Sequence, residues 1–352
     1  MLKHFWIGLA ATFLLASPAQ AQHPLFVDNS ELDIVIEAPF TTLLRAARRN
    51  TDPHPGALIL NGQTEPQRYN LLVSARGQSR RITDRCTFPP LRIDFENNEL
   101  RNTLFRGQNR LKLTTHCRPN ANFVQHYVLE YLAYRLYNEI TPMSFRARPL
   151  NVTYRDTEGR RRDESWFGFF VEDEDDLARR NSRVALEIET GVVTAASLDA
   201  EAGARLALFQ FMIGNVDWDM VEGAQGRDCC HNTRLLAASE TARSGLVAAP
   251  YDFDSSGLVD APYAAPPSNL RMSSVRDRRY RGYCAHNEHV PAAIALFQSR
   301  REAIGAVIAG EARLSEQRRR AAQQYVDGFF ETIADPERVR RQITDRCRQS
   351  TG

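Results

Sequence analysis

The chain has 352 residues, of which 43% are hydrophobic and 25% are charged. This composition is typical of a folded protein with a sizeable core, and it excludes a disordered or fibrous chain. Lysine and arginine total 45 against 43 acidic residues, and a formal net charge of +2 argues against a nucleic-acid-binding surface. We therefore expect a globular protein with no nucleic-acid partner.

The first 21 residues have the pattern of a secretory signal peptide. A short basic start leads into an apolar run from Phe5 to about Ala16, and Ala19 and Ala21 fit a small-residue cleavage site. The run is too short to span a bilayer by itself, and a retained N-terminal anchor is the alternative. We therefore expect an exported protein, periplasmic or extracellular, with no transmembrane segment in the mature chain.

The chain contains six cysteines, and an even number in an exported protein favours disulfides. A bond between Cys86 and Cys117 is expected, because each lies beside a predicted strand of the N-terminal half. The adjacent pair Cys229-Cys230 could reach the last two cysteines, at 284 and 347. A zinc site at Cys229, Cys230 and His231 is the alternative, although the spacing is not that of a zinc ribbon.

The N-terminal half alternates apolar and polar residues in short runs, which is typical of half-buried strands. The expected strands cover residues 32–37, 57–60, 70–75, 91–95 and 110–114, with a short helix at 39–49. From Asn122 to about Glu139 the apolar spacing becomes helical, and Asn122 is a suitable cap. A hairpin of residues 147–154 and 165–172 follows. These elements predict a β-rich N-terminal lobe over residues 22–175.

The C-terminal half has mostly helical patterns. An acidic run at 173–176 is expected to be solvated, and a strong amphipathic helix follows at 202–213. Two strand-like runs at 233–237 and 246–249 are expected to form a hairpin, and residues 288–347 to form two or three helices. The order of elements predicts an α+β fold with a cleft between a mainly antiparallel N-terminal sheet and a mostly helical lobe over residues 176–352.

The segment from Gly214 to Gly257 combines the groups that phosphoryl transfer needs. Such a site requires metal ions to bridge phosphates, a carboxylate to orient the attacking hydroxyl, and a cation on the α/β phosphates. The predicted hairpin places Asn232 and Asp252 at the same end, where an amide oxygen and a carboxylate suit Mg²⁺ or Mn²⁺. Asp217 lies upstream, on a loop after a helix. This order predicts a metal-dependent site that uses ATP.

Lys112 is the one lysine left after removal of the signal peptide, because the only other lysine is Lys3. A compact ammonium differs from a guanidinium in hydration and geometry, so position 112 is a candidate phosphate ligand. Glu130, in the following helix, could pair with it. Survival of one lysine by coding bias and a surface role for Glu130 are the alternatives.

These segments resemble the CotH family of secreted, atypical protein kinases. The resemblance covers roughly residues 30 to 290 and is carried by the motifs Ser74–Arg80, Leu91–Phe95, Arg110–Leu113, Phe123–Tyr137, Gly168–Glu172, Gly214–Asp217, Asn232 and Asp252–Asp254. It implies a protein-kinase-like two-lobed fold. It also implies phosphoryl transfer from ATP to a hydroxyl acceptor, which could be a protein or a small molecule.

The resemblance also implies residue roles. Lys112 would hold phosphates, Glu130 would orient Lys112, and Asp217 would be the general base. Asn232 and Asp252 would bind the metal with Asp254 as a second ligand. The segment from Arg76 to Arg81 could cover the phosphates, while Glu172 could orient Lys112 or bind near the adenine.

The sequence departs from the family at several points. Fourteen residues separate Asp217 from Asn232, where ordinary kinases have four, and Asp219 could then be the catalytic carboxylate. A glycine-rich phosphate loop is not visible. These departures leave open a catalytically inactive kinase-like binding module of the cell envelope. A third possibility is an exported hydrolase that binds Ca²⁺ or Zn²⁺ through His231, His286 and His289.

Overall fold

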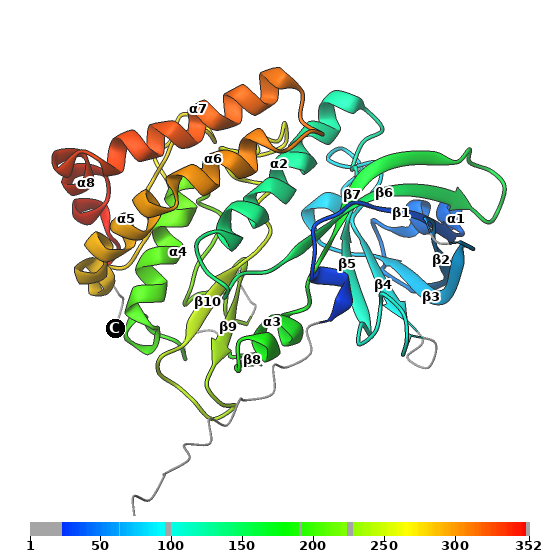
Figure 1. Ribbon diagram of the computed structural model, residues 1–352, viewed down its shortest axis with the longest axis horizontal. Helices are drawn as coiled ribbons and strands as arrows, with labels where there is room; N and C mark the ends of the chain where they lie inside the picture. The colour runs from blue at the N-terminus through cyan, green and yellow to red at the C-terminus, as the bar shows by residue number, and fades with distance from the viewer. Residues whose placement is uncertain (1–22, 63, 96–99, 190–191, 224–227, 350–352) are drawn as a thin grey trace, which may run out of the picture.

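The computed structural model describes residues 23–349 except 63, 96–99, 190–191 and 224–227 (Figure 1). The expected signal peptide over residues 1–21 lies outside these ranges. Within them, no helix has the length and apolar character needed to cross a bilayer.

The N-terminal part of the described chain is a closed barrel of seven strands. Around the barrel the order is β1 (Leu32–Ala38), β2 (His54–Leu60), β3 (Gln67–Ala75), β4 (Leu91–Phe95), β5 (Arg110–Thr114), β7 (Glu164–Val171) and β6 (Ala147–Asp156). Ile93 and Leu111 alternate with polar neighbours and, with buried residues such as Ile36 and Val73, fill the interior. Several predicted strands, including 91–95 and 110–114, are therefore present.

The predicted two-lobed, kinase-like fold with a mainly antiparallel N-terminal sheet is wrong. Strand β1 pairs with β2 in antiparallel fashion, but it also pairs with β6 in parallel over seven residues, from Leu32 opposite Leu150 to Ala38 opposite Asp156. This parallel pairing closes the sheet into a mixed barrel. The strands that meet there are more than a hundred positions apart, and the local alternation of apolar residues carries no information on such pairing.

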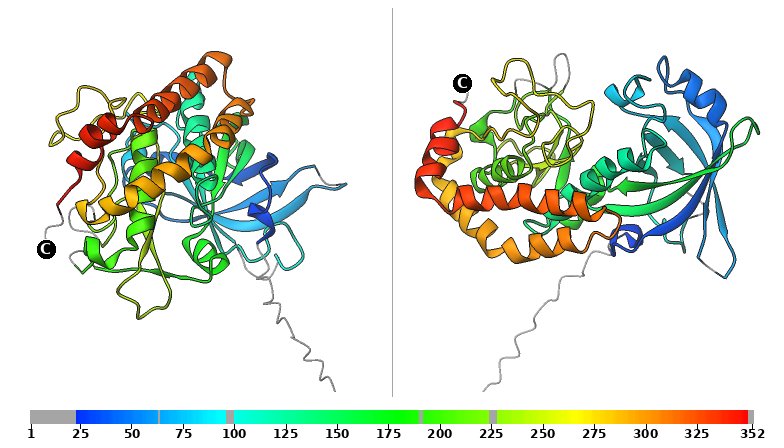
Figure 2. Two further views of the ribbon diagram at one scale, coloured as in Figure 1. Left: turned by 60° about the vertical axis from the view of Figure 1, so that its left-hand side comes forward. Right: turned by 90° about the horizontal axis from the view of Figure 1, so that it is seen from above.

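Helix α2 (Ala121–Asn138) lies between the barrel and the C-terminal helices such as α6 (Arg301–Ala309) and α7 (Glu316–Ile333) (Figures 1 and 2). The Asn120 side chain accepts hydrogen bonds from the backbone N–H groups of Asn122 and Phe123, at 2.9 and 3.1 Å, so Asn120 is the cap rather than Asn122. The helix packs against β6 and β7 on one side and α6 on the other. Most of its residues are buried for this reason.

The other helices of the described chain are α1 (Phe40–Ala46), α3 (Glu174–Arg180), α4 (Ala200–Ile213), α5 (Val290–Ser299), α6 (Arg301–Ala309), α7 (Glu316–Ile333) and α8 (Pro336–Gln342). A small antiparallel sheet has the order β10 (Val247–Pro250), β9 (Thr233–Ala237) and β8 (Val184–Leu186). It packs on α3 and α4 (Figure 1). The predicted hairpin of residues 233–237 and 246–249 forms two of its strands.

All six cysteines are paired in disulfides. The expected Cys86–Cys117 bond is present. The other two bonds join Cys284 to Cys347 and Cys229 to its neighbour Cys230. The suggestion that the adjacent pair reaches the last two cysteines is therefore wrong. The zinc alternative also loses its thiolate ligands, since both sulfur atoms are already bonded to each other.

Candidate functional site

A cleft of about 710 Å³ gathers four of the predicted site residues. Arg76 enters it from the turn after β3 and Asp217 from the loop after α4, while Asn232 precedes β9 and Asp252 follows β10 at the open end of that hairpin. His231 and the Cys229–Cys230 disulfide form another part of its wall. Three separate stretches of the chain thus contribute polar groups to one open space.

The hairpin fixes the relative position of Asn232 and Asp252. Thr233 pairs with Pro250, and the Tyr251 N–H donates to the Asn232 carbonyl at 3.0 Å. Asn232 and Asp252 both have a positive φ, of 50° and 62°, a conformation that Asn and Asp tolerate better than most residues. The prediction that these two residues lie at the same end of a hairpin is confirmed.

Asp217 is held by its neighbours with its carboxylate toward the cleft. Helix α4 ends at Gly214, whose φ of 64° is left-handed. The Asp217 carboxylate then accepts hydrogen bonds from His231 Nε2 at 2.7 Å and from the Asn232 amide at 3.2 Å. Burial favours a higher pKa for Asp217, but these bonds outweigh it and hold the pKa below its ordinary value. Asp217 is therefore an ionised acceptor, with its side chain 41% exposed.

Asp219, the alternative catalytic carboxylate, is buried among structural partners. One oxygen accepts from the Tyr283 hydroxyl at 2.9 Å and the Val221 N–H at 3.0 Å, while the other pairs with Arg348. It does not line the cleft. Asp217 is therefore the candidate carboxylate of the cleft, whereas Asp219 has a structural role.

Arg80 lies in the segment Arg76–Arg81 that was expected to cover the phosphates, but its buried contacts with three carboxylates were not predicted. It lies in the 3₁₀ helix η2 (Ser79–Arg81), and its guanidinium contacts Glu130 at 3.1 Å, Asp252 at 2.5 Å and Asp254 at 3.3 Å. Only 6% of the Arg80 side chain is exposed. In a chain with 45 basic residues, almost all of them arginine, the sequence does not indicate which carboxylates this arginine contacts.

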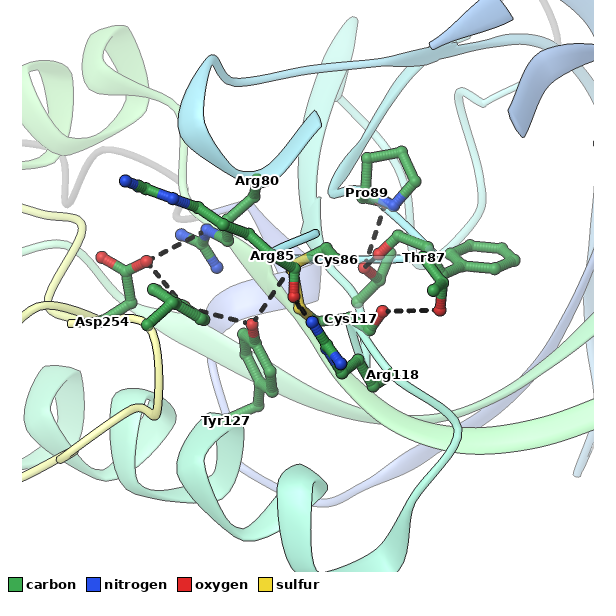
Figure 3. The surroundings of a disulfide bond; sticks show 12 residues. Arg80, Arg85, Cys86, Thr87, Pro89, Cys117, Arg118, Tyr127 and Asp254 are labelled. Carbon is green, nitrogen blue, oxygen red and sulfur yellow. Dashed lines mark hydrogen bonds and ion pairs between the residues drawn. A yellow bond between two sulfur atoms is a disulfide. The ribbon is translucent and has the colours of Figure 1, made fainter. Parts of the chain in front are cut away.

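The Cys86–Cys117 disulfide lies beside this charged cluster (Figure 3). Cys86 Sγ is 3.7 Å from the Tyr127 hydroxyl, which is 3.2 Å from the Tyr263 hydroxyl. Tyr263 in turn donates to Asp254 at 2.8 Å. The disulfide therefore supports the loop that carries Arg80 and the hydroxyl chain that leads to Asp254.

Three carboxylates share the single guanidinium of Arg80, and burial together with this negative charge raises the pKa of two of them, Glu130 and Asp254. Burial raises the pKa of Glu130 to about 8, with Arg80 opposing and Asp254 and Asp252 adding to the shift. Burial likewise raises the pKa of Asp254 to about 6, with Asp252 adding to the shift. A further cation beside Asp252 would offset this negative charge.

The expected pair of Lys112 with Glu130 does not form. Lys112 forms an ion pair with Glu174, at the start of α3, and its ammonium lies 6.0 Å from the Tyr251 ring centroid. Burial lowers the pKa of Lys112 despite the neighbouring Glu174. The lysine thus lies close behind the cleft residue Tyr251, but its partner comes from the acidic run rather than from α2.

Glu172 is also placed differently from expectation. Its carboxylate accepts from Arg180 at 2.8 and 2.9 Å and from the Arg146 N–H at 3.0 Å, so it neither orients Lys112 nor lines the cleft. The acidic run that follows is not simply solvated, because Glu174 pairs with Lys112 and Asp176 is buried. Charge density alone could not distinguish these carboxylates from surface residues.

The predicted metal ligands are only partly brought together. Asn232 and Asp252 line the cleft, whereas Asp254 is buried behind them on Arg80 and Tyr263. Among the described residues, no group of three or more His, Cys, Asp or Glu side chains is arranged to hold a metal ion. His286, proposed for the hydrolase alternative, instead contacts the Ala195 carbonyl at 3.0 Å.

Comparison with known proteins gives no family assignment. No family model matches the chain, and no curated protein matches it significantly. The function therefore has to be argued from the cleft itself.

Proposed function

We propose that the cleft transfers a phosphoryl group from a metal–ATP complex to a hydroxyl acceptor. The observation that carries the proposal is the convergence of Asp217, Asn232 and Asp252 beside the cations Arg76 and Arg80. This combination supplies the carboxylate, the hard oxygen ligands and the positive charge that phosphoryl transfer requires. The proposal rests on these side chains and does not depend on a kinase-like fold.

The cleft residues fit a magnesium or manganese ion. Asn232 donates to Asp217 through its side-chain amide nitrogen. The side-chain carbonyl oxygen of Asn232 is therefore left for a cation. Asp252 binds Arg80 through one oxygen and has its other oxygen as a second ligand atom. Mg²⁺ is usually held by one or two protein groups together with substrate phosphates, so a full protein cage is not needed. When bound, the ion would neutralise the charge of the phosphates.

The acceptor step depends on Asp217. Its carboxylate is ionised, and hydrogen bonds from His231 and Asn232 fix its orientation. The acceptor oxygen forms a bond to the γ-phosphorus as the bond from that phosphorus to the β–γ bridging oxygen breaks. ADP is the leaving group, and the hydroxyl proton passes to Asp217. Arg76 and the exposed turn at Gly77–Ser79 lie where they can contact phosphate oxygens.

One observation favours a second candidate, a nucleotide-binding module without catalysis. The Arg80 guanidinium lies 2.5 Å from an oxygen of Asp252 and 3.3 Å from an oxygen of Asp254. It therefore occupies the space between the two carboxylates that a second metal ion would need. A protein that binds ATP without turnover would keep this ion pair permanently.

Transfer of label from γ-labelled ATP, with Mg²⁺ or Mn²⁺, tests the proposal. The disulfide-intact protein should label itself or a generic acidic protein, and Asp217→Asn should reduce the rate at least a hundredfold with little change in ATP affinity. Asp219→Asn would be a poor control because that residue holds the fold, so Asp228→Asn, on the cleft wall, serves instead. Binding of ATP without transfer would favour the non-catalytic module, and absence of both would contradict both candidates.

A further inference from the structure

A second cavity, of about 380 Å³, shares no lining residue with the cleft. It lies where the C-terminal end of α2, the start of β6, the end of α3, the junction of α5 and α6, and the segment after η1 (Pro24–Phe26) meet. Its volume is in the range of small-molecule sites. The proposed transfer reaction makes no use of it.

The walls of this cavity are strongly basic. Four arginines line it, namely Arg135, Arg146, Arg180 and Arg300, against one lining carboxylate, Glu139. The buried Glu172 lies beneath and adds a second negative charge. The carbonyl end of α2 contributes about half a negative charge more. The cavity therefore keeps an excess of positive charge from arginines in four separate parts of the chain.

Glu172 belongs to the hydrogen-bond network that forms the wall of the cavity. It binds the Nε and Nη2 atoms of Arg180, whose other donors contact the carbonyls of Pro142 and Ser144 at 2.6 and 2.5 Å. Burial and the nearby charge of Arg180 lower the pKa of Arg146, with Glu172 opposing the shift. Arg146 also donates from Nη1 to the Phe26 carbonyl at 3.3 Å, so Glu172 and backbone carbonyls fix both arginines in the wall of the cavity.

We propose that this arginine pocket binds a small ligand with two or more oxyanion groups, of the polyphosphate or polycarboxylate class. Guanidinium groups bind such oxyanions through paired, charge-assisted hydrogen bonds. Arg180 and Arg146 form the rigid base of the site, and Arg135 and Arg300 stand at its rim. Arg300, between α5 and α6, is exposed, so its side chain can supply charge to the ligand.

Calorimetric titration with inorganic pyrophosphate and with citrate tests the pocket. EDTA in the buffer removes divalent cations, so that metal-dependent binding in the cleft does not contribute. We expect at least one probe to bind, and Arg300→Glu to weaken the affinity at least tenfold. Arg48→Glu, the same charge change on an exposed residue after α1, should alter it less than twofold. Binding of pyrophosphate alone indicates a phosphate ligand, and binding of both probes indicates the broader class.

Three outcomes would overturn the proposal. They are failure of both probes to bind, equal affinity in Arg300→Glu and the natural protein, and loss of binding in Asp252→Ala, which would place the ligand in the cleft. Equal unfolding temperatures for the two arginine variants would show that a loss of affinity does not reflect misfolding. Since the cleft and the pocket are tested by different variants, this proposal and the proposed transfer reaction can fail separately.

Discussion

Arg80 and Glu130 form a buried ion pair, with Nη1 3.1 Å from Oε2 and Nη2 3.3 Å from Oε1. The pair links the turn after β3 to α2, and Arg80 extends it to Asp252 at the edge of the cleft. The position of the cleft carboxylate therefore depends on a charge that is itself buried, and this relationship makes the stability of the protein and the geometry of the site inseparable.

Removal of Arg80 should be strongly destabilising. Arg80→Met leaves Glu130 and Asp254 without their partner, and breaking a buried ion pair in this way typically costs about 3–5 kcal/mol. Chemical denaturation measures the change in the free energy of unfolding. The double variant Arg80→Met with Glu130→Gln should recover part of the loss, because it also replaces the buried carboxyl that has lost its cation. A single variant as stable as the natural protein would show that the pair does not support the fold.

The raised pKa values of Glu130 and Asp254 predict that stability depends on pH. A carboxyl whose pKa is higher in the folded than in the unfolded protein takes up protons on folding. The free energy of unfolding should therefore fall as the pH rises from about 5 to about 8, the range between the ordinary value and the pKa of about 8 for Glu130. Denaturation at several pH values, without divalent cations, measures this slope.

Glu130→Gln is the matched control for that experiment. It keeps the size of the side chain and removes its charge, so the fall in stability between pH 5 and 8 should become clearly smaller. A free energy of unfolding that rises over this range in the natural protein would contradict the assignment of excess negative charge around Arg80.

Two disulfides should differ in their effect on the cleft. Loss of Cys86–Cys117 or of Cys284–Cys347 should each cost about 4 kcal/mol by the loop-entropy relation. Only the first lies beside Tyr127 and Arg80, so Cys86→Ser with Cys117→Ser should also weaken ATP binding several-fold under conditions where the variant is folded. Equal effects of both double variants on ATP affinity would argue against a positioning role for Cys86–Cys117.

The hydrogen bond from His231 should set the pH dependence of activity. It helps to hold the pKa of Asp217 low, and Asp217 in turn raises the pKa of His231. In His231→Gln the pKa of Asp217 should rise, so the acidic limb of the kcat/KM profile should move to higher pH. If the maximum of kcat/KM falls while the acidic limb stays at the same pH, His231 acts through packing alone.

Local patterns in the sequence predicted individual elements well. Alternating burial in 91–95 and 110–114 and the helical spacing of α2 are properties of neighbouring residues, and the structure has these elements there. Barrel closure depends on the pairing of β1 with β6, and local patterns do not indicate which strand edges pair. The same holds for ion pairs, since Glu174 rather than Glu130 reaches Lys112, and Arg80 takes the place beside Glu130.

The relative position of two candidate site residues was predicted correctly where one hairpin holds both. It was not predicted for residues that come from distant segments. The hairpin placed Asn232 and Asp252 together because a strand, a turn and a second strand return the chain to its starting point. Lys112, Glu172 and Asp254 depend on how the barrel, α3 and the loop after β10 pack against one another. Their roles therefore required the three-dimensional structure.

The most direct measurement is the affinity of the disulfide-intact protein for ATP with and without Mg²⁺, compared with Asp252→Ala. We predict tight binding that needs the metal, and a loss of affinity of at least a hundredfold in the variant. The far-ultraviolet circular dichroism of the variant should be unchanged, because Arg80 keeps Glu130 and Asp254 as partners. Unchanged metal-dependent ATP affinity in Asp252→Ala would contradict the assignment of the cleft as the phosphate and metal site.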